Sequence, residues 1–112
     1  MPGGEEAERA AERFYVGVLG LERVPKPPAL AVRGGCWFEG PSVRLHLGVD
    51  AEFRPATKAH PAITVDDLDV ACQRIVAAGG EVRSADGLPG VARIHTDDPF
   101  GNRVELIQAV GP

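Results

Sequence analysis

The 112-residue chain has little of what marks several large classes of protein. It has two cysteines, Cys36 and Cys72, too few for a disulfide framework, and each lies among apolar neighbours as a small core residue would. Its apolar runs are too short to span a bilayer. Its first residues lack the basic segment and apolar stretch of a secretory signal. The sequence therefore predicts a cytoplasmic protein with no membrane partner.

Charge of one sign is not concentrated anywhere either. The chain has 12 Lys and Arg against 16 Asp and Glu, a net charge of −4, and its basic residues are scattered. No basic run offers a surface for phosphates, so we expect no nucleic-acid partner. The apolar fraction of 44% and the charged fraction of 25% are typical of a folded globular protein, and the length suits one domain.

Helical and strand patterns alternate along the chain. Apolar residues at helical spacing predict a helix over residues 5–19, ended by Gly20, and another over residues 66–78, with Asp66 as its N-cap. Asp97 and Asp98 are expected to shape a turn over residues 98–102 through side-chain hydrogen bonds, and residues 86–90 form a loop. Strands are predicted over residues 21–24, 33–39, 43–49, 59–65, 81–84, 91–96 and 103–107.

The two halves of the chain form an internal repeat at a constant offset of 59 residues. This offset places Gly20 on Gly79, Arg44 on Arg103 and Leu47 on Leu106. A repeat with one offset predicts two similar modules. We expect a single α+β domain over residues 1–112, with module one at 1–50, a connector at 51–58 and module two at 59–112.

The repeat leaves the strand at residues 59–65 without a counterpart, which would lie at or before Met1. The chain would then begin inside the loop that follows a first strand. Either the protein lacks this strand and covers the exposed sheet edge in another way, or the start codon has been placed too late. The second explanation is favoured because an open edge is prone to aggregation.

Three segments resemble the glyoxalase / bleomycin-resistance / extradiol-dioxygenase (vicinal oxygen chelate) superfamily, and together they span nearly the whole chain. They are residues 13–21 (RFYVGVLGL), residues 59–68 (AHPAITVDDL) and residues 98–106 (DPFGNRVEL). The resemblance implies two βαβββ modules whose strands form a curled mixed sheet around a cleft. It also implies metal ligands on the first and last strands of each module. Carried over to this sequence, these ligands are His46, His60 and Glu105, and the fourth is missing.

The residues themselves agree with this set. In the last strand of each half, His46 and Glu105 point to the face opposite the neighbouring apolar side chains. Two imidazoles and a carboxylate suit Zn, Fe, Mn, Ni or Co and leave positions open for water or substrate. Each residue also has a structural explanation: His46 hydrogen-bonded in the cleft, His60 at a strand start, and Glu105 paired with Arg103 or Arg44.

The expected function is that of a metal-dependent lyase, isomerase or ring-cleaving dioxygenase acting on a small vicinal-oxygen substrate, with Glu105 also moving a proton. The alternative is metal-free binding of a small molecule or antibiotic, as in bleomycin-resistance relatives. A homodimer is expected in both cases. Candidate substrate-binding residues are Arg44, Arg103, Trp37, Arg93 and His95, each of which has a structural alternative as a surface, rim or packing residue.

Overall fold

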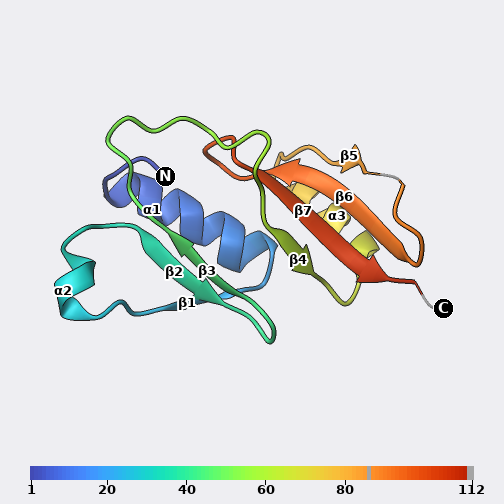
Figure 1. The fold of residues 1–112 in the computed structure, drawn as a ribbon, viewed down its shortest axis with the longest axis horizontal. Helices are drawn as coiled ribbons and strands as arrows, with labels where there is room; N and C mark the ends of the chain where they lie inside the picture. Colours follow the sequence, from blue (N-terminus) through green and yellow to red (C-terminus); the bar gives the residue numbers. More distant parts are fainter. Residues whose placement is uncertain (86, 111–112) are drawn as a thin grey trace. The chain divides into compact units, whose positions relative to one another are not determined.

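The computed structural model describes residues 1–85 and 87–110, and the chain divides into two compact units, Met1–Pro55 and Ala56–Pro112 (Figure 1). Each unit has its own sheet and at least one helix, which confirms the predicted mixed α+β class. Within the described residues, no helix has the length and apolar character needed to cross a membrane.

The first unit consists of helical segments and a three-stranded antiparallel sheet of order β1-β2-β3. Its elements are α1 (Glu5–Glu12), the π-helical segment η1 (Arg13–Val18), β1 (Glu22–Val24), α2 (Pro28–Ala31), β2 (Cys36–Glu39) and β3 (Arg44–Leu47). Helix α1 begins with three acidic residues in its first turn, where they interact favourably with the helix dipole.

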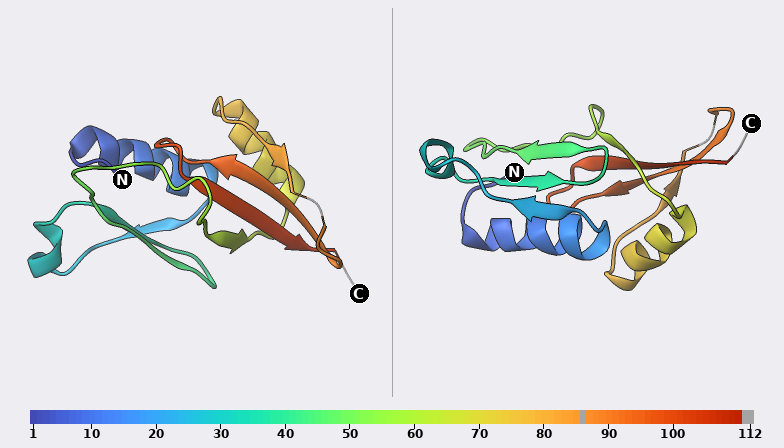
Figure 2. Two further views of the ribbon diagram at one scale, coloured as in Figure 1. Left: turned by 45° about the horizontal axis from the view of Figure 1, so that its top comes forward. Right: turned by 90° about the horizontal axis from the view of Figure 1, so that it is seen from below.

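The core of the first unit lies between the α1–η1 helix and one face of this sheet (Figure 2, right). Ala11 and Tyr15 come from the helix, and Cys36 and Phe38 from β2; all four are at most 1% exposed. The rings of Tyr15 and Phe38 lie 5.2 Å apart. Because side chains alternate along a strand, Trp37 is directed to the opposite face of the sheet.

The second unit has a four-stranded sheet of order β4-β7-β6-β5, in which β4 runs parallel to β7 and the other pairs are antiparallel. Helix α3 lies along one face of this sheet (Figure 2, right). Leu68 and Ile75 of the helix are buried, as are Val104 and Leu106 of β7. The elements are β4 (Ala62–Thr64), α3 (Leu68–Ala77), β5 (Arg83–Ser84), β6 (Val91–Asp97) and β7 (Arg103–Ala109).

A tight turn joins β6 to β7 and fixes their pairing. The Asp98 carboxylate accepts hydrogen bonds from the backbone N–H groups of Phe100 and Asn102 and from Asn102 Nδ2, each at 2.9 Å. Asn102 Oδ1 in turn accepts from the N–H of Ala56, and Arg103 donates its N–H to the Ala56 carbonyl. The turn therefore also anchors the start of the second unit.

Several positions agree with the internal repeat. The helical segments end at Val18 and Ala77, the same 59 residues apart. Gly20 and Gly79 follow them with φ values of 79° and 86°, a left-handed conformation that glycine adopts without steric cost. Strands β3 and β7 begin at Arg44 and Arg103, which the offset also matches.

Some predicted boundaries were wrong. The N-cap of α3 is Asp67, whose carboxylate accepts from the Val70 N–H at 3.1 Å, and not Asp66. Residues 33–35 do not extend β2, because Gly34 and Gly35 have φ values of 73° and 87°. The first helix changes to π-helical geometry from Arg13 onward. Of the loop predicted at residues 86–90, the first residue lies outside the described part of the chain.

Met1 lies outside the assigned strands but is hydrogen-bonded to the segment that follows β3. Its amino group donates to the Gly48 carbonyl at 2.8 Å, and the Asp50 N–H donates to the Met1 carbonyl at 3.0 Å. This is the bonding of one residue in a parallel strand pair. Met1, which is 6% exposed, therefore lies beside the segment that follows β3. In the second unit, Val65 at the end of β4 donates its N–H to Ile107 of β7 in a similar way.

Candidate metal centre

The candidate site lies on the face of the second unit's sheet that is opposite α3. Strand register sets its members: His95 of β6 lies across from Glu105 of β7, and Ala62 of β4 flanks Glu105 on its other side. His60 precedes β4 by two residues. The polar side chains of three neighbouring strand segments therefore converge on Glu105, whose side chain is only 6% exposed.

His60 contacts both the backbone and Glu105. Its Nδ1 lies 2.8 Å from the Lys58 carbonyl oxygen, and its Nε2 lies 2.9 Å from Glu105 Oε1. A carbonyl only accepts hydrogen bonds, so Nδ1 carries the ring hydrogen. A singly protonated ring then presents the lone pair of Nε2 to the carboxylate. That contact becomes favourable when a second proton or a cation lies between the two atoms.

His95 and Arg93 approach the same carboxylate oxygen. His95 Nε2 and Arg93 Nη1 each lie 3.1 Å from Glu105 Oε1, and both side chains are largely buried, 19% and 20% exposed. The rings of His60 and His95 meet edge to face with centroids 5.0 Å apart. His95 is therefore no simple surface residue of its strand. Glu105 pairs with Arg93, and among the described residues of the second unit no ion pair joins it to Arg103.

The electrostatics of the cluster favour an ionised Glu105. Burial acts to raise the pKa of this carboxyl, but the contacts with His60 and His95 and the charge of Arg93 outweigh it and hold the pKa below its ordinary value of 4.5. The carboxylate is thus a charged acceptor in a partly dehydrated site, where opposite charges attract more strongly than in water.

A second ion pair lies on the same face, beside the cluster. Both terminal guanidinium nitrogens of Arg83, Nη1 and Nη2, donate to the Asp97 carboxylate at 2.7 Å, and these bonds lower the pKa of Asp97. Asp97 therefore bridges to β5 instead of shaping the turn as expected. Arg103 is paired across the sheet with Asp97, and its Nε is buried with no hydrogen-bond partner in the described residues.

The predicted site residues of the first unit form a separate group within that unit. Trp37 and His46 are paired across β2 and β3, and their rings are stacked, with centroids 3.9 Å apart and planes 4° from parallel. The Lys26 amine lies 5.9 Å from the Trp37 ring centre. Arg44 is exposed and lies 3.6 Å from Glu39. Trp37 and His46 are thus flat aromatic groups on the sheet face opposite α1.

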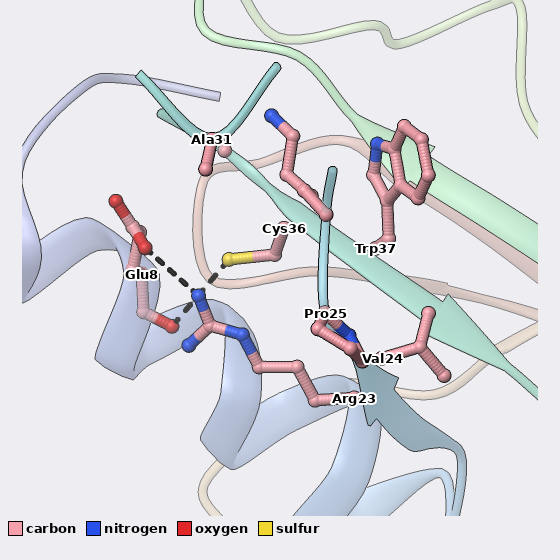
Figure 3. A pocket seen from close by; sticks show the side chains of 9 residues that line it. Glu8, Arg23, Val24, Pro25, Ala31, Cys36 and Trp37 are labelled. Carbon is pink, nitrogen blue, oxygen red and sulfur yellow. Dashed lines mark hydrogen bonds and ion pairs between the residues drawn. The ribbon is translucent and has the colours of Figure 1, made fainter. Parts of the chain in front are cut away.

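A small cavity of about 140 Å³ lies beside Trp37 and is lined by Glu8, Arg23 and Cys36 among others (Figure 3). Arg23 donates to Glu8 at 2.8 Å and lies 3.4 Å from Glu12, so its charge is balanced. Burial raises the pKa of the Cys36 thiol, which therefore stays protonated at neutral pH. The cavity therefore offers no unbalanced positive charge to an anion, and we interpret its lining as structural.

The donor set of the cluster fits a divalent cation. One ligand atom from each of His60, His95 and Glu105 lies within 4.8 Å of the others. Metal–ligand bonds of about 2.0–2.2 Å place neighbouring ligands about 3 Å apart, close to the His–Glu separations found here. The Nδ1 bond of His60 to a backbone carbonyl is also the usual outer contact of a metal-bound histidine.

The fold and the cluster define a small α+β domain with a candidate metal centre on a sheet face. The family model of the glyoxalase-like domain matches residues 5–107, and a Bacillus anthracis protein assigned to the glyoxalase family is 40% identical, covering 97% of this chain and 88% of its own, with a TM-score of 0.89. The chain therefore belongs to the glyoxalase-like family, within the glyoxalase / bleomycin resistance / dioxygenase superfamily, and the resemblance seen in the sequence is confirmed.

Two further solved structures share the fold. A lactoylglutathione lyase from Agrobacterium tumefaciens is 28% identical, with 89% of this chain and 84% of that chain covered and a TM-score of 0.67. TnmS3, an antibiotic binding protein from Streptomyces sp. CB03234, is 23% identical, with coverages of 97% and 90% and a TM-score of 0.70. No curated protein is similar enough in sequence to count as a match.

Proposed function

We propose that this chain is a metal-dependent enzyme of the glyoxalase or dioxygenase type, a lyase, isomerase or ring-cleaving dioxygenase for a small substrate with vicinal oxygens. The observation that carries the proposal is the convergence of His60 and His95 on the ionised, nearly buried Glu105. His60 and Glu105 would be ligands at the positions that the resemblance to a two-module βαβββ pattern with a cleft implies. That pattern assigns the third position to His46.

A divalent ion, Zn, Fe, Mn, Ni or Co, would supply Lewis acidity to the substrate oxygens. The protein's own groups orient the substrate. Arg93 and Arg103 lie on the same sheet face as Glu105 and offer charged donors to a carboxylate or enolate oxygen. Glu105 is the proposed acceptor of a proton next to a carbonyl.

The alternative proposal is metal-free binding of a small molecule or antibiotic. Two observations favour it: Arg93 already provides Glu105 with a cation at 3.1 Å, and the stacked Trp37 and His46 offer a flat surface for a planar ligand. A fold neighbour, TnmS3, is described as an antibiotic binding protein, and one scaffold can support unrelated functions.

Metal analysis and an activity assay separate the two proposals. The protein is purified without a histidine tag, analysed by mass spectrometry for metals, and assayed with small 2-hydroxy and 2-oxo carbonyl compounds and catechols, before and after chelation. Turnover that requires metal and disappears in Glu105→Gln supports the enzyme. Metal-free protein whose ligand affinity is indifferent to chelator supports the binding module and contradicts the enzyme.

The cytoplasmic location and the homodimer also remain parts of the proposal. Light scattering on the purified chain tests the oligomeric state, and a monomer at all concentrations would contradict the dimer.

A further inference from the structure

We propose that His95 is a metal ligand, and that His60, His95 and Glu105 form a complete metal centre within the second unit. This inference rests on the proposed metal dependence but replaces His46 as the third ligand. His95 lies on β6, the penultimate strand, whereas the pattern used for the sequence places ligands only on first and last strands.

The first argument is geometric. His95 Nε2 and His60 Nε2 are held at 3.1 Å and 2.9 Å from the same oxygen, Glu105 Oε1. An ion entering between them needs only small shifts of three side chains. Two imidazoles and one carboxylate are the protein ligands of several catalytic zinc and non-haem iron sites, and they leave the remaining positions open.

The second argument is the hydrogen balance of the cluster. His60 donates its Nδ1 hydrogen to the Lys58 carbonyl, so its Nε2 meets Glu105 as a bare lone pair unless the ring gains a second proton. A divalent ion would accept this lone pair and would also pair with the Glu105 carboxylate, which His95 Nε2 approaches to 3.1 Å.

The third argument is rigidity. Glu105 lies within β7, between its partners β6 and β4, and the hydrogen-bonded Asp98–Asn102 turn fixes the pairing of His95 with Glu105. The Glu105 N–H donates to the Pro61 carbonyl, next to His60. Ligands on paired strands lose little conformational freedom when a metal binds, which favours affinity.

Calorimetric titration of the chelator-treated full chain with Zn²⁺ and Co²⁺ tests the proposal. The key variant is His95→Gln, which keeps a polar side chain on the strand, and the matched control is His46→Gln, a histidine on a strand of the first unit. Loss of an outer-sphere partner of a metal ligand weakens binding by about 10- to 100-fold. We expect His95→Gln and His60→Gln to weaken it by at least about 100-fold, and His46→Gln to leave it unchanged.

The outcomes are distinguishable. If His46→Gln abolishes metal binding and His95→Gln does not, this inference is overturned while the metal-dependent function stands. If the unaltered protein binds neither ion, both fail and the binding module remains. X-ray absorption of the Zn²⁺-loaded proteins gives a second measurement: two imidazole ligands in His46→Gln and one in His95→Gln are expected, and the reverse count contradicts the proposal. Unfolding curves of the metal-free variants verify that each is folded.

Discussion

At the scale of single residues, the chemistry of the candidate site depends on how Glu105 keeps its charge. Burial alone would favour the neutral acid, yet His60, His95 and Arg93 each place a nitrogen within 3.1 Å of the same carboxylate oxygen. The ionisation of this side chain therefore affects both the proposed metal binding and the stability of the folded protein.

This linkage predicts a pH dependence of stability. A carboxyl whose pKa is lowered by folding stabilises the folded state above its unfolded pKa, and this contribution is lost as the pH falls through the folded value. For metal-free protein, Glu105→Gln should lower the free energy of unfolding by about 1–3 kcal/mol at neutral pH, and the difference should shrink below the ordinary pKa of 4.5. Urea denaturation of both proteins across this range measures it.

The control for this experiment is Glu39→Gln, which removes an exposed carboxylate 3.6 Å from Arg44. An exposed pair of this kind contributes at most about 1 kcal/mol. A difference for Glu105→Gln that is no larger than that of the control, or that grows toward acid pH, would contradict the linkage.

The sequence predicted His60 and Glu105 as metal ligands and His95 only as a candidate substrate-binding residue, and the structure brings all three together. Alternation tells which face of a strand a residue is on, but not which residue it meets across the sheet. The missing signal was the predicted turn at residues 98–102: counting outward from Phe100 pairs Asp97 with Arg103 and His95 with Glu105, as the structure has them. Arg93 reaches Glu105 diagonally, and only side-chain conformation decides such a contact.

At the scale of helices and strands, two local hydrogen-bonding arrangements position the second unit. One is the N-cap of α3 and the other is the turn between β6 and β7. Apolar residues at helical spacing predicted the helix, and the residue types at 98–102 predicted the turn. It misplaced the cap by one residue, because Asp66 and Asp67 are chemically equal in sequence and differ only in backbone conformation.

The cap can be tested directly. Asp67→Ala removes the acceptor of the Val70 N–H and should destabilise the protein by about 1 kcal/mol. Asp66→Ala is the matched control and should have less than half this effect. Thermal unfolding of the two variants measures the difference, and the opposite order would restore Asp66 as the cap.

The turn offers a stronger prediction. Asp98→Ala leaves two backbone N–H groups and the Asn102 amide without their acceptor and should cost about 2–4 kcal/mol of stability. It should also weaken metal binding, because the turn holds His95 opposite Glu105. Calorimetry at a temperature where the variant is folded measures the affinity. Unaltered affinity would mean that the strand pairing is independent of the turn.

At the scale of the whole molecule, each unit has its own sheet and its own core. The repeat predicts two modules within a single domain, and the same helix end and the same strand start recur 59 residues apart. The proposed third ligand could not be predicted in the same way, because a repeat transfers positions from one half to the other, and the position equivalent to His95 is Cys36.

A centre contained in the second unit predicts where metal protects the backbone. Saturating Zn²⁺ should slow hydrogen exchange in β6, β7 and the segment before β4, and leave β2 and β3 unchanged. Ligand at 100 times its dissociation constant stabilises the binding state by about 2.7 kcal/mol, enough to detect. Equal protection of β3 would assign His46 to the ion after all. His95→Gln, which should show no protection, is the control.

The stacked pair on β2 and β3 has a spectroscopic consequence. Trp37 is the only tryptophan, and its indole lies flat against the His46 imidazole. The intrinsic emission of the protein therefore reports on a single place in the first unit. If added metal leaves the tryptophan emission unchanged and a planar ligand alters it, the metal binds in the second unit and the planar ligand binds next to Trp37 in the first.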